Sequence, residues 1–466
     1  MTQVVVIGAG PAGLVAATLL AEQQVPVLLL DEQPAPGGQI YRNIECAVAK
    51  PALAVALGAD YQYGAQLTAR FRASGATYQP GAQVWQVTPQ REVWFSHGGR
   101  SQQVVGDTII VATGAMERPV PLPGWTLPGV MTAGALQIML KSAALVPDEP
   151  FVIAGSGPLL YLLVQQCLAT GARPAAVLDT TARANQQRAL RFLPKAAATR
   201  EGRAYLAKGL AMLAALRRSG VPRYRHVTDI RIDGTASVTG IAFRSGGRQH
   251  RLATRLVALH EGVIPAQQLP RSIGCDFVWD SVQCCFAPRL DAWGNSSIDG
   301  VLIAGDAGGI GGARAAEHAG RLAAYEALRH LGRINVTQRD SLAANDQRAR
   351  HAHLAIRRFL DVLYAPRDEI LQPADDVTVC RCEEIAAGAV RAVVRQGCLG
   401  PNQAKAFLRA GMGACQGRLC GPVVTELIAA ERGVAPGEVG YYRIRPPLKP
   451  ISLGELVGCD SRHGRA

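Results

Sequence analysis

The sequence predicts an α/β protein with two Rossmann-like dinucleotide-binding domains, the second inserted into the first, and a small helical C-terminal domain. Three observations lead to this prediction. A glycine-rich strand–turn–helix pattern begins at Val4, an altered copy of it begins at Phe151, and two close pairs of cysteines lie near the C-terminus. The length of 466 residues is sufficient for two or three domains with large cores.

The N-terminal pattern is complete. An apolar, β-branched run at residues 4–7 is typical of a buried strand, and a helical pattern follows the next six residues. Those six residues are Gly8-Ala9-Gly10-Pro11-Ala12-Gly13. The first glycine permits a tight turn, the second lets the backbone approach a pyrophosphate, and the third lets helix and strand pack closely. The next strand ends at Asp31 and Glu32, where a carboxylate can accept hydrogen bonds from a ribose.

Two later segments belong to the same domain. A buried strand over residues 108–112 ends in the turn Thr113-Gly114, and another over residues 301–304 ends at Gly305-Asp306. A glycine-rich helix start follows at Gly312-Ala313, and its free N–H groups and positive dipole end suit an electron-rich ring edge. Asp306 can accept hydrogen bonds from a sugar or ribityl hydroxyl. The alternative is that it only caps the helix.

The second pattern is degenerate. It contains Gly155 and Gly157, but Leu160 stands at the third glycine position, where it should hold the helix away from the strand. The following strand ends at Asp179, so the position that binds ribose is still acidic. This domain could bind NAD(P)H or an adenine nucleotide such as ATP or ADP, or it could be a vestigial fold. We favour the vestigial or altered site.

Charge and hydropathy indicate which partners and which cellular location the protein has. The net charge is +13, and the segment from Arg183 to Arg225 is basic with Glu201 as its only acid. Leu206, Leu210, Leu213 and Leu216 share one helical face there, which favours a packed helix with a solvated basic side over a docking surface. Nucleic acid is the least favoured partner, because no recognised binding module accompanies the charge. With no signal peptide or membrane span in the pattern, we expect a cytoplasmic protein, and a peripheral contact with a membrane complex stays open.

Four of the eleven cysteines form a set of their own. Cys380 and Cys382 make a Cys-x-Cys pair, and Cys415 and Cys420 make a Cys-x4-Cys pair, with helix-like stretches between. Iron–sulfur clusters need four such thiolates. A structural zinc site is the main rival, but Cys-x-Cys is tight for a zinc knuckle. The other seven cysteines, Cys459 among them, show no ligand spacing, and we expect buried, inert thiols there.

The glycine motifs and the cysteine set each carry a resemblance. The segment 1–333 resembles the flavoproteins with two dinucleotide-binding domains, although it lacks their active-site dithiol. The segment 377–432 resembles the bacterioferritin-associated-ferredoxin-like (BFD-like) [2Fe–2S] domain. With the Pro-rich stretch at residues 446–450, the whole chain resembles the family of flavoprotein subunits that includes the A subunit of opine oxidase, the B chain of hydrogen cyanide synthase and the FAD subunit of D-hydroxyproline dehydrogenase.

These resemblances imply cofactors and their contacts. FAD would lie with its pyrophosphate at the first glycine motif and its adenosine ribose at Asp31. Further contacts would come from Gly38, Gln39, Val84, Thr113, Gly114 and Asp306. A [2Fe–2S] cluster would be held by the four cysteines named above. The implied division is an FAD domain over 1–148 and 262–333, an NAD(P)-like domain over 149–261, a helical linker over 334–375, a cluster domain over 376–432 and a tail over 433–466.

The resemblance also implies an activity. We expect an electron-transfer subunit of a heteromeric amino-acid or amine dehydrogenase, which relays electrons from a partner flavin subunit, with a small ferredoxin-like subunit as an optional third member. One alternative is a self-contained NAD(P)H-dependent flavin oxidoreductase, and another is an architectural subunit that binds an adenine nucleotide. The sequence shows no carboxylate clamp or acid/base pair beside the flavin, so we assign no catalytic residue.

Overall fold

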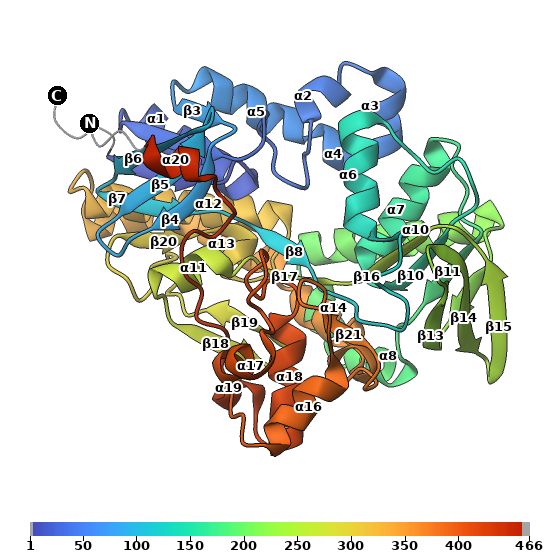
Figure 1. The fold of residues 1–466 in the computed structure, drawn as a ribbon. Helices are drawn as coiled ribbons and strands as arrows, with labels where there is room; N and C mark the ends of the chain where they lie inside the picture. Colours follow the sequence, from blue (N-terminus) through green and yellow to red (C-terminus); the bar gives the residue numbers. More distant parts are fainter. Residues whose placement is uncertain (1–2, 459–466) are drawn as a thin grey trace.

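The structure is a computed structural model, and it describes residues 3–458. In Figure 1 the chain forms three lobes. The N-terminal part and residues near 300 share one lobe, the middle of the chain forms a second, and the C-terminal part forms a third of short helices. Cys459, for which the sequence predicts an inert thiol, lies outside the described residues.

The first lobe is built on a five-stranded parallel sheet. Across the sheet its strands are β20 (Val301–Ile303), β7 (Thr108–Val111), β1 (Val4–Ile7), β2 (Val27–Asp31) and β3 (Thr77–Pro80). β1 and β7 are buried along their whole length, as expected for parallel strands covered on both faces. Because β20 pairs with β7 across the intervening chain, this domain is split around an insertion, as the sequence predicts.

Helices and a small antiparallel sheet complete this lobe. α1 (Pro11–Glu22) packs against α12 (Ala313–His330) so closely that a Cβ on Gly320 would lie 2.2 Å from the carbonyl oxygen of Ala12. The remaining elements are α2 (Ile44–Ala47), α3 (Pro51–Leu57), α4 (Ala59–Gln62), α5 (Gly64–Ala73), β4 (Gln83–Val87), β5 (Glu92–His97) and β6 (Arg100–Val105).

The second lobe repeats the same plan. Its parallel sheet has the order β12 (Arg223–Arg225), β11 (Ala176–Asp179), β10 (Val152–Ser156), β16 (Val257–Glu261) and β9 (Val130–Thr132). β9 pairs with β16 and forms the edge of this sheet. The inserted domain therefore includes a strand that precedes residue 149, the residue at which the sequence analysis starts this domain. Around this sheet lie α6 (Ala133–Ala143), α7 (Pro158–Ala169), α8 (Arg183–Leu190), α9 (Leu193–Ala197), α10 (Arg200–Ser219) and the antiparallel β13 (Thr228–Gly234), β14 (Val238–Ser245) and β15 (Arg248–Ala253).

The burial of helix α10 differs from what its leucine pattern predicts. Met212 and Leu216 are buried, but Leu210 is 68% exposed, so the four leucines do not form one packed face. Leu210 instead lines a cavity of about 410 Å³ together with Tyr161, Arg217 and Arg223.

An antiparallel ribbon joins the two lobes. It pairs β8 (Ala115–Glu117) with β17 (Val263–Pro265), and in Figure 1 it lies between the two parallel sheets. The chain then forms α11 (Gln268–Ile273), β18 (Phe277–Asp280) and β19 (Cys285–Pro288) before it returns to the first sheet.

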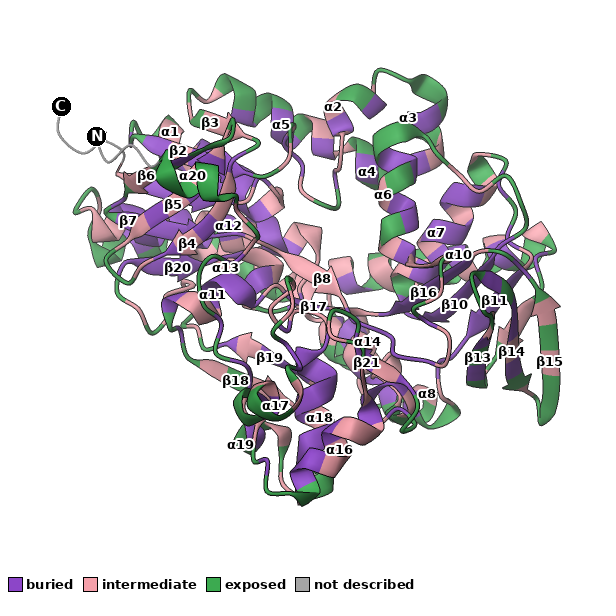
Figure 2. Ribbon diagram, viewed as in Figure 1, coloured by how far each residue is buried: buried purple, intermediate pink, exposed green. Residues whose placement is uncertain are grey.

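The C-terminal third begins with the helical linker that the sequence predicts. Its helices are α13 (Val336–Leu354), α14 (Arg357–Leu363) and α15 (Asp368–Leu371). The third lobe follows with β21 (Thr378–Cys380), β22 (Ile385–Ala386), α16 (Ala387–Arg395), α17 (Pro401–Leu408), α18 (Gly421–Arg432) and α19 (Pro436–Val439). Figure 2 shows α18 as the buried helix of this lobe. The tail returns to the first lobe and ends in α20 (Leu453–Val457) near β6.

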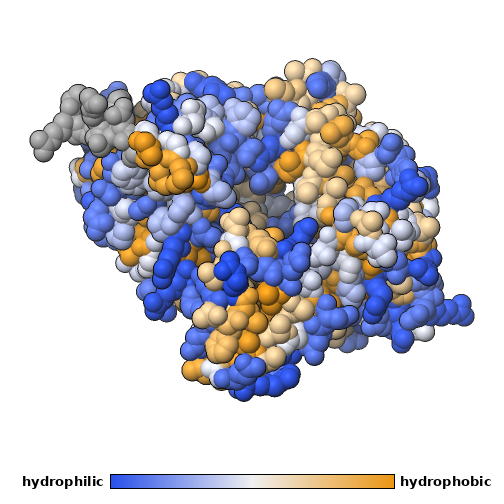
Figure 3. All heavy atoms as spheres, in the orientation of Figure 1, coloured by the Kyte–Doolittle hydropathy of each residue, from blue (hydrophilic) through white to orange (hydrophobic). Residues whose placement is uncertain are grey.

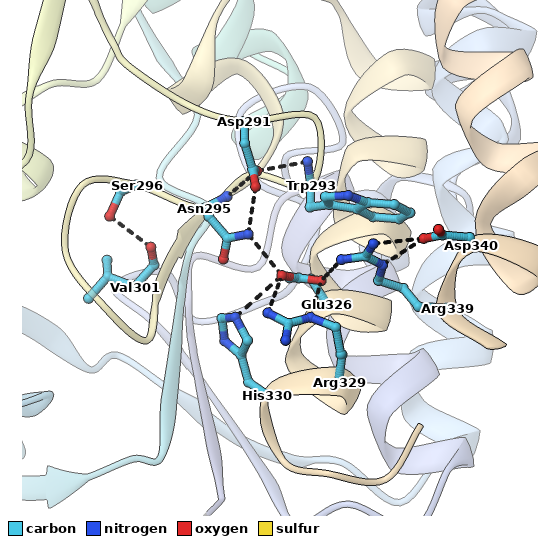
Figure 4. Close-up of polar contacts among 10 residues, drawn as sticks. All are labelled: Asp291, Trp293, Asn295, Ser296, Val301, Glu326, Arg329, His330, Arg339 and Asp340. Atoms are coloured by element: carbon cyan, nitrogen blue, oxygen red, sulfur yellow. Dashed lines mark hydrogen bonds and ion pairs between the residues drawn. The ribbon is translucent and has the colours of Figure 1, made fainter. Parts of the chain in front are cut away.

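A buried carboxylate fixes the linker to the first lobe (Figure 4). Glu326 in α12 is 1% exposed and accepts hydrogen bonds from Arg329 (2.7 Å), Arg339 of α13 (2.6 Å) and Asn295 (2.9 Å). Burial alone would raise the pKa of Glu326, but hydrogen bonds from His330 and both arginines outweigh it, so this pKa is well below its ordinary value. The Arg339 guanidinium also stacks on Trp293.

Apolar side chains gather at several places on the face of the molecule shown in Figure 3. Figure 3 shows apolar side chains over α20 and over parts of the third lobe. Those of α20 are Leu453, Leu456 and Val457, which are 80%, 45% and 87% exposed. Within residues 3–458, no helix combines the length and the apolar content needed to cross a membrane.

Candidate cofactor sites

The first glycine motif has the shape that a pyrophosphate site requires. Gly8 has φ +106°, and a Cβ there would lie 2.5 Å from the Ala112 carbonyl oxygen. A Cβ on Gly13 would lie 1.9 Å from the Gly8 carbonyl oxygen, so tight packing requires both glycines. Gly10 differs, because a Cβ there would come no closer than 3.9 Å to another atom, the Cα of Gly38. The space beside Gly10 therefore lies open at the start of α1, where Pro11 and Ala12 form the first helical turn.

The two acidic residues after β2 have different surroundings. Asp31 is 8% exposed and accepts hydrogen bonds from the backbone N–H groups of Ala9 and Gln33, so its carboxylate already supports the glycine loop. Burial raises the pKa of Asp31 above its ordinary value. Glu32 is exposed and forms an ion pair with Lys449 of the tail. No sequence signal pointed to Lys449, because it lies more than four hundred residues further along the chain.

A buried lysine positions the loop that contains Gly38 and Gln39. The Lys141 ammonium of α6 donates to the carbonyl oxygens of Gln39 (3.2 Å) and Ile40 (3.0 Å) and to the side chain of Gln137 (2.8 Å). Burial, together with the charge of Arg42, lowers the pKa of Lys141 to about 7. Gly38 has φ +61° and its Cα faces Gly10. No sequence signal pointed to Lys141, because the helix that carries it has an ordinary apolar pattern.

Asp306 lies in the short turn before α12 and is not the N-cap residue of that helix, which is Gly312. One of its oxygens, Oδ1, accepts from the N–H groups of Gly311 (2.8 Å) and Gly312 (2.9 Å), so it does hold the loop before the helix. Gly312 has φ +88°, and a Cβ there would meet no atom within 4 Å, which leaves space beside Ala313. Gly305 begins the short 3-10 turn η1 (Gly305–Gly308), and a Cβ there would lie 2.9 Å from the Cβ of Ala12.

The remaining predicted flavin contacts are Thr113 and Gly114, which follow β7, and Val84 in β4. Among the described residues, the Thr113 hydroxyl is buried without a hydrogen-bond partner, and a Cβ on Gly114 would meet no atom within 4 Å. Val84 in β4 is half-buried opposite Phe95. An unpaired buried hydroxyl and open space beside three glycines fit a bound dinucleotide such as FAD.

The second glycine motif meets the neighbouring strand as the first one does, but different side chains surround it. Gly155 has φ +140°, and a Cβ there would lie 1.7 Å from the carbonyl oxygen of His260. The His260 imidazole lies beside Gly157 and contacts Glu117 at 2.7 Å. Asp179 is 1% exposed, and its carboxylate already accepts from Tyr161 (2.8 Å), Arg223 (2.6 Å) and the N–H of Thr181 (3.0 Å).

A second carboxylate lies buried at the same end of this sheet. Glu261, at the end of β16, is 2% exposed. It accepts hydrogen bonds from Ser156 of the glycine motif (3.1 Å) and Thr180 (3.0 Å), and Arg367 of the linker pairs with it at 2.9 Å. The Arg367 guanidinium balances the charge of this carboxylate, so a buried ion pair between strand and linker lies beside the second glycine motif.

The four cysteines of the third lobe come together in two pairs. Cys380 lies next to Cys420, and Cys382 lies next to Cys415. The Cys420 thiol, with backbone N–H groups such as that of Gly411, lowers the pKa of Cys380 to about 6. Among residues 3–458, no three His, Cys, Asp or Glu side chains are grouped to hold a single metal ion. Two pairs of thiols suit a two-iron cluster, in which each iron takes two cysteines.

The two pairs differ in burial. Cys380 and Cys420 are 1% and 0% exposed, whereas Cys382 is exposed and Cys415 half-buried. The chain bends sharply around them, since a Cβ on Gly413 would lie 2.1 Å from the Cβ of Cys382. Of the cysteines outside this set, Cys46 is exposed and Cys284 half-buried, contrary to the expectation of burial.

Comparison with known families defines the class. Residues 2–160 match the pyridine nucleotide-disulphide oxidoreductase family, and residues 378–430 match the BFD-like [2Fe-2S] binding domain. The protein is therefore an FAD-dependent oxidoreductase that also carries a [2Fe–2S] cluster. This confirms the class and both cofactors predicted from the sequence.

Full-length relatives define the family. The chain is 50% identical over 461 residues to the A subunit of opine oxidase from Rhizobium meliloti (strain 1021), across 97% of this chain and 98% of that one. It is 32% identical over 468 residues to the hydrogen cyanide synthase subunit HcnB of Pseudomonas aeruginosa, across 96% of each. The chain belongs to the family of the opine oxidase A subunits. In fold it resembles L-proline dehydrogenase from P. horikoshii, with a TM-score of 0.71 and 17% identity over 98% of this chain and 79% of that one.

Proposed function

We propose that this chain is the electron-transfer subunit of a cytoplasmic, heteromeric amine or amino-acid dehydrogenase of the opine, D-hydroxyproline or glycine type. A partner subunit with its own flavin would oxidise the C–N bond of the substrate and release two electrons. This chain would relay them toward an acceptor. Two relatives are named as subunits, of opine oxidase and of hydrogen cyanide synthase, which supports a partner subunit. A small ferredoxin-like subunit would be an optional addition.

The observation that carries this proposal is a hydrogen-bonded connection between the two cofactor regions. The carbonyl oxygen of Gly114 accepts from the N–H of Ala266 at 3.0 Å. Two residues further along, the side chain of Gln268 donates to the carbonyl oxygen of Gln416 at 3.2 Å, and Gln416 follows Cys415. Because electron transfer slows steeply with distance, a short protein connection between the expected flavin turn and a cluster ligand favours a relay.

The outer pair of cysteines supports exchange with a second protein. Cys382 is exposed, so one edge of the cluster would lie at the protein surface. Met412 in the cysteine loop is 50% exposed, and the Arg409 side chain is 66% exposed while paired with Glu383. Methionine and arginine are enriched at protein–protein interfaces. A partner subunit that docks here would come close to the cluster.

The second lobe argues against the first alternative. A self-contained NAD(P)H oxidoreductase needs a free carboxylate to hold the ribose of the nucleotide, but the Asp179 carboxylate already accepts from Tyr161 and Arg223, and the Glu261 carboxylate is bonded to the glycine motif. Arg367 extends from the linker to that same edge. The architectural alternative, with bound ATP or ADP, meets the same obstacle at this edge.

Anaerobic reduction of the holoprotein tests the proposal. NADH or NADPH should not bleach the flavin of the isolated chain at a rate comparable to turnover. Amine substrate should produce the EPR signal of the reduced cluster only when the partner subunit, co-purified from the native host with a tagged chain, is present. Rapid flavin bleaching by NADH in the isolated chain would contradict the proposal, as would tightly bound ADP or ATP released on denaturation.

A further inference from the structure

A tyrosine hydroxyl lies against one of the cluster cysteines. The hydroxyl oxygen of Tyr442 is 3.7 Å from the Sγ of Cys420, and both residues are buried, at 1% and 0% exposure. Tyr442 belongs to the tail, outside the segment that matches the cluster-binding domain, residues 378–430. No ligand motif therefore includes it.

The chain around Tyr442 is shaped to hold the ring in this place. Gly411 and Gly417 have φ +83° and +76°, and a Cβ on them would lie 2.5 Å and 2.3 Å from ring atoms of Tyr442. These two glycines lie on either side of Cys415 in the cysteine loop. The Lys405 ammonium lies 4.9 Å from the centre of the same ring. Ring and loop are thus packed together, and any larger residue at either glycine would displace the hydroxyl from the sulfur.

The direction of this hydrogen bond is fixed once the cluster is bound. A cysteine that ligates iron has lost its proton and can only accept a hydrogen bond. The tyrosine hydroxyl must then donate. Hydrogen bonds to the ligand sulfurs are one of the means by which a protein sets the reduction potential of an iron–sulfur cluster.

We propose that Tyr442 raises the reduction potential of the [2Fe–2S] cluster by donating a hydrogen bond to the Cys420 sulfur. The inference rests on the proposed electron relay, in which this potential decides how readily the cluster accepts an electron. Reduction adds one electron and makes the ligand sulfurs more negative. The hydrogen bond then strengthens, because a charged acceptor binds a donor more tightly, and the reduced form gains more than the oxidised form. The tyrosine keeps its proton in both states.

The adjacent tyrosine provides a matched control. Tyr441 lies in the same tail segment and is also buried, at 8% exposure. Its hydroxyl donates to the backbone carbonyl oxygen of Gly417 at 3.2 Å, not to a sulfur. Tyr441→Phe therefore removes a hydroxyl from the same buried region without removing a donor from a cluster ligand.

An EPR-monitored redox titration of the full-length holoprotein tests the proposal, with dithionite as reductant. Tyr442→Phe should lower the equilibrium constant for reduction of the cluster by about threefold to tenfold, where tenfold corresponds to 59 mV for one electron. Tyr441→Phe should leave it close to the wild-type value. Equal potentials for wild type and Tyr442→Phe would overturn the proposal, and so would an equal shift in the two variants.

A second substitution keeps the proposal testable if Tyr442→Phe fails to assemble its cluster. Incorporation of 3-fluorotyrosine at position 442 makes the hydroxyl a stronger donor and should raise the potential. An unchanged or lower potential would refute the role of the hydroxyl. Since dithionite replaces the partner subunit, failure of that partner to reduce the cluster would refute only the proposed relay and would leave the difference between the variants unaffected.

Discussion

Replacement of Asp306 tests the FAD site most directly, because this carboxylate has two separable tasks. Its Oδ1 atom accepts from the N–H groups of Gly311 and Gly312 and so shapes the loop at the start of α12. We expect the rest of the carboxylate to hold a hydroxyl of the ribityl chain. Asp306→Leu removes both functions, whereas Asp306→Asn keeps one neutral acceptor oxygen.

The structure sets the expected magnitude. The ribityl hydroxyl that loses an ionised acceptor in Asp306→Leu costs about 1–3 kcal/mol. The dissociation constant for FAD should therefore rise about 5- to 140-fold, since about 1.4 kcal/mol corresponds to tenfold. Asp306→Asn weakens the same hydrogen bond without removing it, and about 1 kcal/mol would raise the constant about fivefold.

Flavin content and affinity provide the assay. FAD released by denaturation is measured by its absorbance, and apoprotein is titrated with FAD through quenching of flavin fluorescence. The EPR signal of the cluster should persist in both variants and shows that the third lobe is intact. Asp299→Leu is the matched control, because its side chain is fully exposed just before β20. Wild-type FAD content and affinity in Asp306→Leu would refute the reasoning.

Three further predictions concern the cluster, a buried charge and pH. Cys380→Ser or Cys415→Ser should each abolish the EPR signal of the reduced cluster while FAD stays bound, and an unchanged signal would exclude that thiol as a ligand. Glu326→Gln should lower the free energy of unfolding in urea by about 3–5 kcal/mol, since the largely buried Arg339 guanidinium loses its buried charge partner and keeps only the half-exposed Asp340. Glu22→Gln, which breaks an exposed pair, should cost less than about 1 kcal/mol, and similar losses in the two variants would contradict the argument. Burial raises the pKa of Glu426 to about 7 from 4.5, so its folded form holds a proton that the unfolded chain has lost between these values. Stability should therefore fall as pH rises from 4.5 to 7, by up to about 3 kcal/mol, and Glu426→Gln should flatten this slope in urea titrations.

Local patterns were sufficient for the glycine and cysteine motifs. A side chain at Gly8 or Gly13 would clash with backbone atoms that lie close in sequence or on the adjacent strand. The glycines that the turn and the helix packing require therefore fall within one short, recognisable segment. The spacing of the cysteines predicted that the four thiols come together, but only the structure shows that Cys380 lies next to Cys420 and Cys382 next to Cys415. The leucine pattern of α10 predicted one packed face, and this prediction was wrong for Leu210, because neighbouring elements leave that side chain beside a cavity.

The sequence by itself determined the α/β class, the insertion of the second dinucleotide-binding domain into the first and the two cofactors, and it predicted the residues at the glycine loop and the cluster. Each of these depends on backbone geometry or ligand chemistry that requires particular residues at fixed spacing. Only the tertiary structure decided which charges and hydroxyls come to those sites from elsewhere. Lys141, Lys449, Arg367 and Tyr442 arrive from remote segments. A long-range contact needs only one suitable side chain at each end, and a single side chain forms no motif or periodic pattern that could be recognised in the sequence.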